Sequence, residues 1–520
     1  RDGASQITAA NANVPGVFEF GVPKVDKNNF APRVGFAWSP NWDNAFGRFL
    51  FGDQGESSIR GNFARSFFAN FSNLVSNSVP PTSQGELQFT GNAGNFLQTG
   101  GAANLPYVPN LTAAFLRANA GSYIVDQIVP YADSITFSYQ RQLGLNNGIE
   151  IRFLRTMGRQ MPVQVQLNAR QVPNAAYVIP TFLSAPTPSQ LTSLPTIASV
   201  VAANPTIDPA TLLGTRPLGQ FGFAGVLTAF PALGESNYNG LSGTFTRRFA
   251  QNIGFTAAYT LSKTEDNSTN ELNTSALNPR RPQDAGNFFG SGLNIDNEWG
   301  ASPLDVRHRF VTSFTADIPF FNNSDNKVLK AILGGFQLNG IFQAQTGQPI
   351  TVLAGRDANR NGDGAGDRAI FNAAGDPNLS SAVQAVALVG GVVTNVPMGD
   401  TRTVGYVALN PNAGFISTGI FARELANQGV GTSGRNAFHT RGFNNTDLVV
   451  LKNSRFGTDG RFNFQIGAEI FDLFNQRAKT IAGVGSQTAA FATAGNANFN
   501  NYDIGSFTGR IVRMRVKFFF

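Results

Sequence analysis

The last ten residues, 511–520, constrain the fold of this chain more than any other segment. If they form a β-strand, alternate side chains point to opposite sides of it. One side is then wholly apolar, with Val512, Met514, Val516, Phe518 and Phe520. The other side is mainly cationic, with Arg513, Arg515 and Lys517 beside Ile511 and Phe519. A strand between lipid and a water-filled lumen requires this pattern, whereas a soluble edge strand would expose three consecutive phenylalanines to aggregation.

The composition agrees with a membrane protein built from strands. The 520 residues are 42% hydrophobic and 14% charged. No apolar run reaches the length of about 18 residues that a transmembrane helix needs, so no such helix is predicted. Alternating strands disperse apolar residues in this way, because only every second side chain faces lipid.

The absence of cysteine excludes disulfides, thiolate catalysis and cysteine-ligated metals together. It is consistent with a protein that crosses an oxidising compartment. The formal net charge is +7, with a pI of about 9.7. The basic residues are scattered and form no stripe, so we expect a cationic lumen and cationic turns, and no nucleic-acid binding.

Eleven segments show the two-residue period of a half-buried strand. In residues 134–142, for example, Ile135, Phe137 and Tyr139 alternate with polar residues. The eleven predicted strands are residues 33–40, 58–67, 134–142, 148–153, 240–249, 254–262, 306–318, 335–345, 446–453, 461–470 and 511–520. A twelfth strand is predicted near residues 14–21.

Successive connections between these strands lie at alternate ends of the sheet, and those at one end are all shorter than those at the other. Counting back from the last strand, the connections at the end where the chain finishes are 454–460, 320–334, 250–253, 144–147 and 41–57. Those at the opposite end are 476–507, 346–445, 263–305, 156–239 and 68–133, and each is longer than any of the first set. Short turns on one side and long loops on the other are typical of outer-membrane barrels, and a soluble sandwich has no reason to sort its loops.

Several connections carry local signals of their own. Asn146-Asn147-Gly148 and Gly457-Thr-Asp-Gly460 predict hairpin turns, because Asn and Gly tolerate positive φ. The stretch 188–202 predicts either a short helix or an irregular surface loop, and the Val/Ala/Gly-rich stretch 382–393 predicts an additional hairpin outside the membrane. Loops this long are usually functional or disordered.

Seven motifs, in order along nearly the whole chain, resemble the C-terminal half of a TonB-dependent outer-membrane transporter of the Oar-like group. They are Asn29-Phe-Ala-Pro-Arg-Val-Gly-Phe-Ala-Trp-Ser-Pro40, Ser236-Asn-Tyr-Asn-Gly-Leu241 with Arg247-Arg-Phe249, Ala258-Tyr-Thr-Leu-Ser-Lys-Thr-Glu-Asp266, Asp305-Val-Arg-His-Arg-Phe310, Gly340-Ile-Phe-Gln-Ala-Gln-Thr-Gly-Gln-Pro-Ile350, Gly434-Arg-Asn-Ala-Phe438 and Glu469-Ile-Phe-Asp-Leu-Phe-Asn475. The apolar face of the last strand, with its terminal Phe520, also resembles the insertion signal of bacterial outer-membrane barrels.

The resemblance implies an all-β, antiparallel transmembrane barrel of 22 strands, of which residues 1–520 would supply about 11–14. It also implies an N-terminal plug and energy from the inner-membrane TonB complex. We expect the signal peptide, the TonB-contacting segment and the plug to lie upstream of Arg1, because Arg1-Asp-Gly-Ala-Ser is no signal peptide. The implied partners are outer-membrane lipid and lipopolysaccharide, the barrel-assembly machinery and the TonB complex.

One local motif is a candidate metal site. Five side chains between residues 356 and 368 have the alternate spacing of a calcium loop: Asp357, Asn359, Asn361, Asp363 and Asp367. Gly362 would supply the sharp turn, but Arg368 stands where a calcium loop of this kind has glutamate. The motif therefore predicts either a weak calcium site in an outer loop or a polar turn without metal.

The remaining polar residues predict structural roles. The only two histidines, His308 and His439, are too few for a histidine metal site, and we expect His308 to make structural hydrogen bonds. Asp472 is expected at a strand end. The cationic face of the last strand predicts either an anion path or lumen-facing charge pairs. No Ser-His-Asp order, nucleophile elbow, phosphate loop or zinc-protease motif occurs, so no enzyme is predicted.

Three functions fit this interpretation. The first is energy-coupled uptake of a scarce ligand, which could be an iron chelate, a glycan or a peptide. The second is an adhesion or surface-organising protein that uses the same barrel and its long loops. The third is a passive porin without a plug. The sequence identifies no ligand-binding residue.

Overall fold

The computed structural model describes most of the chain. The described residues are 13–17, 26–68, 112–118, 122–123, 128–170, 179–268, 281–283, 285–287, 292–358, 360–364, 366–422, 433–456, 461–476, 492–501 and 509–520.

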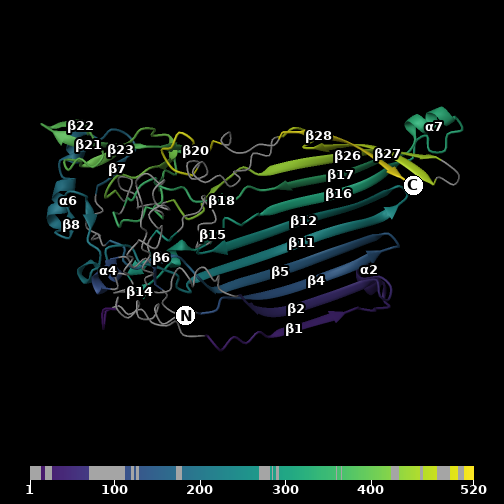
Figure 1. The fold of residues 1–520 in the computed structure, drawn as a ribbon, viewed down its shortest axis with the longest axis horizontal. Coiled ribbons are helices and arrows are strands. Elements are labelled where there is room, and N and C mark those ends of the chain that lie inside the picture. The colour runs from purple at the N-terminus through teal and green to yellow at the C-terminus, as the bar shows by residue number, and fades with distance from the viewer. Residues whose placement is uncertain are drawn as a thin grey trace, which may run out of the picture.

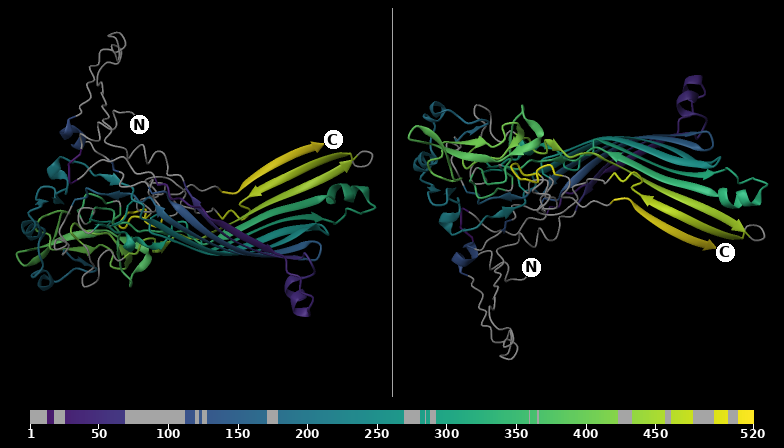
Figure 2. Two further views of the ribbon diagram at one scale, coloured as in Figure 1. Left: turned by 90° about the horizontal axis from the view of Figure 1, so that it is seen from below. Right: turned by 90° about the horizontal axis from the view of Figure 1, so that it is seen from above.

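One long antiparallel sheet forms the body of the molecule (Figure 1). Its strands follow one another in chain order: β1 (Arg33–Trp38), β2 (Ser57–Phe67), β4 (Tyr131–Leu143), β5 (Asn147–Met161), β11 (Gly234–Ala250), β12 (Ile253–Asp266), β16 (His308–Ile318), β17 (Phe336–Gln345), β26 (Phe443–Phe456), β27 (Phe462–Phe471) and β28 (Ile511–Phe519). The short strand β15 (Gly300–Ala301) pairs with the end of β12. All eleven predicted strands are confirmed. The sheet is curved (Figure 2), and β1 and β28 form its two edges.

The register of the sheet separates an apolar face from a polar face. Paired residues on neighbouring strands point to the same side, so side chains form rows across the sheet. One apolar row crosses four strands through Phe137, Phe153, Leu241 and Leu261. One step away, a polar row runs through Ser138, Arg152, Ser242 and Thr260. The apolar rows are largely exposed, as a lipid-facing surface requires.

The two ends of the sheet differ as the loop lengths predict. The long connections gather at one end, hereafter the loop end, and the short turns and the C-terminus lie at the other, hereafter the turn end (Figure 1). Two short helices belong to the turn end: α2 (Ala45–Phe51) and α7 (Lys327–Leu333). No helix in the described ranges combines the length and the apolar character needed to cross a membrane.

The loop end contains most of the buried apolar residues of the described chain. Its small elements are β3 (Ser122–Tyr123), β6 (Val165–Gln166), β7 (Thr181–Phe182), β8 (Ile207–Asp208), β9 (Leu213–Gly214), β10 (Thr228–Ala229), β13 (Gly286–Asn287), β14 (Gly292–Leu293), β18 (Pro349–Ile350), β19 (Ile370–Phe371), β20 (Asp376–Ser381), β21 (Val383–Val389), β22 (Val392–Val396), β23 (Gly405–Ala408), β24 (Ala413–Ile416), β25 (Phe438–His439), α4 (Ala113–Ala118), α5 (Pro188–Leu191), α6 (Ile197–Ala203), η4 (Gly219–Phe221) and η5 (Asp296–Glu298). They pack into four apolar clusters.

Two loop predictions are confirmed at the loop end. The stretch 188–202 forms helices, α5 and α6, and Thr196 caps α6 by accepting from the Ser199 N–H at 3.0 Å. The stretch 382–393 forms the hairpin β21–β22, which turns at Gly390 and Gly391, both with positive φ. Strand β7 pairs with β23, so connections 156–239 and 346–445 fold together.

The predicted β4–β5 turn and the predicted twelfth strand differ from the structure. The β4–β5 hairpin turns at Gly144–Asn146, slightly earlier than predicted, because Gly144 takes the positive φ of +63° and Asn147 already pairs with Leu143. In the predicted twelfth strand, the described residues Val14–Val17 form a turn, closed by the Val17 N–H on the Val14 oxygen at 2.9 Å. The remainder of that stretch and the turn 457–460 lie outside the described residues.

Candidate ligand-binding face at the loop end

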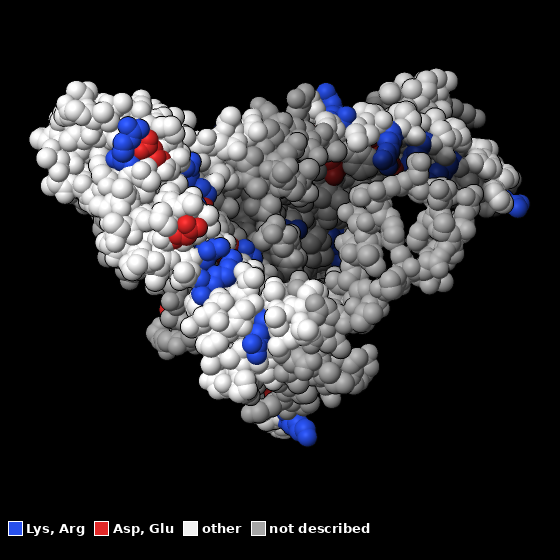
Figure 3. Space-filling view, turned by 60° about the vertical axis from the view of Figure 1, so that its left-hand side comes forward, with Lys and Arg blue, Asp and Glu red and all other residues white. Residues whose placement is uncertain are grey.

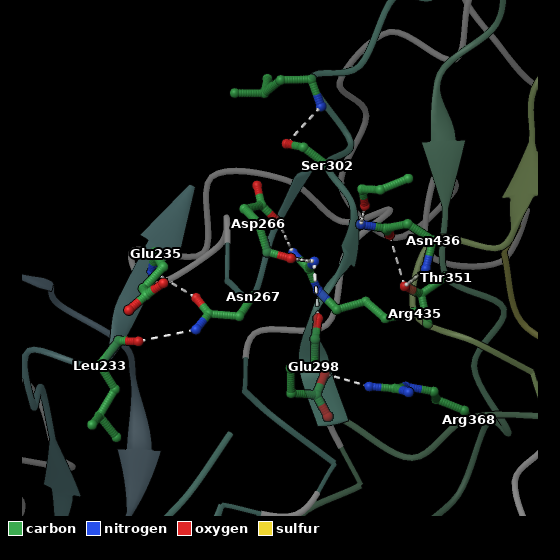
Figure 4. A network of polar contacts seen from close by, with 12 residues as sticks. Leu233, Glu235, Asp266, Asn267, Glu298, Ser302, Thr351, Arg368, Arg435 and Asn436 are labelled. Carbon is green, nitrogen blue, oxygen red and sulfur yellow. Dashed lines mark hydrogen bonds and ion pairs between the residues drawn. The ribbon is translucent and has the colours of Figure 1, made fainter. Parts of the chain in front are cut away.

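A buried ion pair fixes the loop end to the sheet (Figure 4). Arg435, from the long connection between β17 and β26, approaches Asp266 at the end of β12, with 2.5 Å between Nη2 and Oδ1. Arg435 also donates to the main-chain oxygens of Asp266 at 2.7 Å and Glu298 at 3.3 Å. Only 2% of the Arg435 side chain and 5% of the Asp266 side chain are exposed. A lone charge is costly at such depth, so each ion requires the other.

A second buried pair extends this network into a neighbouring connection (Figure 4). Glu298, in η5, binds the guanidinium of Arg368, and the network thus balances two cations with two carboxylates. The Asn436 side chain donates to the Ala301 oxygen at 2.7 Å and accepts from the Thr351 hydroxyl at 2.8 Å. These contacts join β12 to two of the long connections and hold them as one body.

A pocket of about 620 Å³ lies in the connection between β5 and β11. Two guanidinium groups, Arg170 and Arg216, line it, and the other described residues around it are neutral. Arg216 donates to the Asn168 oxygen at 2.7 Å, and Arg170 donates to the Gly214 oxygen at 2.8 Å. Burial lowers the pKa of Arg216, and the positive charge of Arg170 lowers it further. Two fixed cations in a pocket without a lining carboxylate suit an anionic ligand.

The surface of the loop end also has more basic than acidic side chains on view. Figure 3 turns this end toward the viewer. Basic side chains are more prominent than acidic ones on this face. Such a field would attract anions from solution.

The calcium-like loop lies beside this pocket, because the Arg170 N–H donates to the Asn361 oxygen at 2.8 Å. Of the five predicted ligands the structure describes four, and Asn359 lies outside the described residues. Asp357 accepts from the main-chain N–H groups of Asn361 at 3.1 Å and Gly362 at 2.8 Å, as in a polar turn. Asp363 is paired with Arg281 at 2.5 Å.

The fourth described ligand, Asp367, is a buried carboxylate. Its side chain accepts from the Ala358 N–H at 2.8 Å, and the residue is 1% exposed. Within the described ranges, no group of three His, Cys, Asp or Glu side chains is placed to hold a metal ion. Calcium binding at this loop stays a prediction.

Comparison with known proteins places the chain in a family. The sequence matches the outer membrane beta barrel domain over residues 4–511. The chain belongs to this family. It is therefore an outer-membrane β-barrel protein, with the antiparallel sheet as its membrane wall. A search of curated proteins found no match.

Several solved outer-membrane transporters and receptors match this chain at low identity and low TM-score. The outer membrane transporter YddB from Escherichia coli is 8% identical, with a TM-score of 0.37, and the match covers 94% of this chain and 40% of that one. The receptor FpvA of P. aeruginosa is 9% identical, with a TM-score of 0.36, covering 95% and 33%. The FrpB iron transporter from Neisseria meningitidis is 8% identical, with a TM-score of 0.35, covering 94% and 39%. The chain therefore spans less than half the length of these barrels.

The polar face of the sheet contains a charge pair near the C-terminus. Arg515 of β28 pairs with Glu469 of β27, with 2.9 Å between Nη1 and Oε1. Arg515 also donates to the Gln465 side chain at 3.3 Å, and Arg513 lies over the Phe471 ring at 5.4 Å. The predicted charge pair is confirmed for Arg515. That this face lines the lumen, and the alternative of an anion path, stay predictions.

Two further predictions of structural roles are confirmed. His308 shares a hydrogen bond of 2.7 Å with the Tyr259 hydroxyl on the neighbouring strand. Asp472 directly follows β27, and its main-chain N–H donates to the Asp447 carboxylate at 2.9 Å.

Sequence reasoning missed the arginine pocket and the buried ion pairs. Arg435 and Asp266 are 169 residues apart, and Arg368 and Glu298 are 70 apart. Each of these residues occurs in an irregular segment or at a strand end, where no periodic pattern operates. Asp266 and Arg435 do fall within motifs that carry the family resemblance, which is the one signal that pointed toward them.

Asp367 is expected to make the stability of its loop depend on pH. Burial, together with the nearby carboxylates of Asp357 and Asp363, raises the pKa of Asp367 to about 7, although the hydrogen bond from the Ala358 N–H opposes this shift. The folded loop then keeps a proton that the unfolded loop releases, so its free energy of unfolding falls as pH rises from 3.8 to about 7. Asp367→Asn should remove this loss and slow amide hydrogen exchange of residues 352–369 at pH 8 by at least about tenfold, since one pKa unit is about 1.4 kcal/mol.

Asp376→Asn, at an exposed carboxylate of the same connection, is the control for the Asp367 experiment. Equal protection of the native loop at pH 5 and pH 8, after correction for intrinsic exchange, would contradict the prediction. The same measurement tests calcium. If the loop binds it, calcium chloride at pH 8 should restore protection in the native protein and have no effect on Asp367→Asn.

Proposed function

We propose that this barrel is part of a receptor that binds a scarce anionic ligand at its loop end and passes it inward with energy from the TonB complex. The folded loop end is the observation that carries the proposal. A passive pore gains nothing from connections that form four apolar clusters and two buried ion pairs. A receptor requires a rigid and specific outer surface.

The arginine pocket supports an anionic ligand. Arg170 and Arg216 are held by main-chain carbonyls, so they are already oriented before a ligand arrives. Carboxylate or phosphate oxygens would balance both charges. Acidic iron chelates, acidic glycans and acidic peptides all carry such groups.

The proposal is tested by depletion of anionic compounds from the medium, followed by mass spectrometry. Cells that make the complete protein are compared with cells that lack it, each with and without a protonophore. We expect at least one anionic compound to be removed only by producing cells, and its removal to stop when the proton gradient collapses. Removal that continues after collapse would identify a porin. No removal, together with altered cell adhesion, would identify a surface-organising protein.

Two substitutions connect this assay to the pocket. Arg216→Gln should lower depletion of the compound several-fold, because it removes one of the two cations. Arg402→Gln is the matched control, since Arg402 is an exposed arginine that pairs with Asp400 near the β21–β22 hairpin. Equal depletion by both variants would exclude the pocket as the binding site and leave energy-coupled uptake to be judged by the protonophore alone.

A further inference from the structure

Helix α2 is a short and well-capped element of the turn end. Asn44 begins it by accepting from the Gly47 N–H at 2.6 Å. Gly52 ends it at φ +76°, a conformation that favours glycine. The seven residues between them, Ala45–Phe51, include only one charge, Arg48. A helix this short is marginal alone, so its contacts with the barrel determine where it lies.

These contacts attach α2 to the apolar face of the barrel. The Tyr139 hydroxyl donates to the Leu50 oxygen. Arg141, two residues along the same face of β4, donates to the main-chain oxygens of Phe49, Leu50 and Arg48. Since Tyr139 shares its face with Ile135 and Phe137, α2 lies outside the barrel wall and not in the lumen. Figure 2 shows α2 projecting to one side of the sheet.

An aromatic cluster joins α2 to the lipid-facing surface. Phe51 packs against Trp42 with ring centroids 5.1 Å apart, and against Trp38 and Tyr139 at 6.4 Å each. Trp38 and Tyr139 flank Ile59 in the register of β1, β2 and β4, so this cluster continues an apolar row of the membrane wall. Tryptophan and tyrosine favour the boundary between acyl chains and headgroups.

The outer side of α2 is apolar and exposed. Phe46 is 65% exposed and Phe49 is 75% exposed, and Trp42 beside them is 44% exposed. The Arg48 side chain is 61% exposed and lies 3.9 Å from the carboxylate of Asp43, which is 89% exposed. So exposed a pair is weak, and the guanidinium could still reach lipid phosphates while its stem covers apolar surface. The helix thus shows aromatic groups together with one cation, which is the composition of a segment that lies in a membrane interface.

We propose that α2 is an interfacial helix, embedded through Trp42, Phe46 and Phe49 in the phospholipid leaflet at the turn end. That leaflet is the periplasmic one in the orientation derived from the loop lengths. The occupant of the exposed surface is lipid because the surface continues the lipid-facing wall without interruption. The Arg141 contacts hold the helix against the wall at one depth, so α2 would fix the height of the barrel in the membrane.

Helix α7 repeats part of this arrangement independently. Lys452, which shares the apolar face of β26 with Val450, donates to the Gly334 oxygen at the C-terminal end of α7. Val328 and Ile332 of α7 are exposed. A cation from the membrane wall therefore caps a turn-end helix at two separate places on the sheet.

Spin labels attached to single introduced cysteines at three positions test the proposal. Residues 1–520 contain no cysteine, so each label attaches within them only at the chosen position. Phe49→Cys reports on α2. Met514→Cys, 71% exposed on the apolar face of β28, is the lipid control, and Leu409→Cys, 66% exposed at the loop end, is the water control. The complete protein is reconstituted in vesicles of phosphatidylethanolamine and phosphatidylglycerol. Power saturation then measures access of oxygen and of a water-soluble nickel chelate to each label.

We expect the label at position 49 to collide with nickel several-fold less than the label at 409, and to respond to oxygen nearly as strongly as the label at 514. Nickel access equal to that at 409 would place α2 in water and overturn the proposal. Low access to both reagents would place it against protein and also overturn it. Phe46→Cys serves as a second position if the Phe49 variant fails to assemble, and the same outcomes apply.

Discussion

Replacing Arg435 by methionine is expected to destabilise the loop end by about 3–5 kcal/mol, the typical result of removing one partner from a buried ion pair. Asp266, whose side chain is 5% exposed, would lose the guanidinium of Arg435, and the main-chain oxygen of Glu298 would lose a donor. Methionine has a similar volume, so the effect would reflect the lost charge rather than a cavity. Limited proteolysis on intact cells should show faster cleavage of connection 346–445.

The control for this experiment is Arg402→Met, which breaks an ion pair of almost the same length at the surface. The Arg402–Asp400 distance is 2.6 Å, but 63% of the Arg402 side chain is exposed. Exposed pairs contribute little to stability because water and salt screen them, so cleavage should barely change. If both variants are cleaved at the native rate, the network does not hold the loops together and the rigid outer surface of the proposed receptor loses its support.

Removing Phe520 is expected to lower the amount of assembled barrel in the outer membrane several-fold. Phe520 stacks on Phe518 with ring centroids 6.3 Å apart, and Phe518 stacks on Phe462 at 5.9 Å. These rings continue the apolar face of the edge strand β28, where lipid contact and recognition during insertion both require them. The amount of heat-modifiable, folded barrel in isolated outer membranes measures the effect.

Phe519→Ala is the matched control for Phe520, because the two aromatic residues are adjacent but point to opposite faces of the last strand. Phe519 pairs with Asn463 on the polar side of the wall. Native levels after loss of Phe520, or equal losses for both changes, would contradict the assignment of the apolar face as the insertion signal.

The barrel strands could be predicted from the sequence because their signal is local. Residues 134–142 alternate every second position, and the membrane imposes that period on each strand separately. The same rule placed Arg515 on the polar face of the last strand, where it pairs with Glu469. The predicted β4–β5 turn lay slightly too late in the sequence. Both Gly144 and the dipeptide Asn146-Asn147 tolerate positive φ, and the pairing of Leu143 with Asn147 places the turn at Gly144.

The loop end could be predicted only in fragments. The Ser/Pro cluster near residue 188 and the Val/Ala/Gly-rich stretch 382–393 are local signals, so a helix and a hairpin could be predicted there. The structure divides the helical stretch into α5 and α6, because Thr196 begins a new helix as its N-cap. The arginine pocket and the Arg435–Asp266 pair depend on contacts between segments that lie far apart in the sequence. The spacing of apolar residues along a strand or helix gives no information about such long-range contacts. Charge composition alone could not show which arginines become buried.

The position of the apolar clusters has a consequence for the order of folding. The strands of the wall pair with their neighbours in sequence, so each new hairpin can add to the previous one. The clusters, in contrast, combine residues as distant as Ile179 and Phe421, and closing so long a segment early carries a large entropic cost. Once β5 and β26 belong to one sheet, their loops are already brought close. The loop end should therefore fold last, after the strands of the wall have paired. Newly inserted molecules should pass through a stage in which the wall is formed and the loop end is still unfolded.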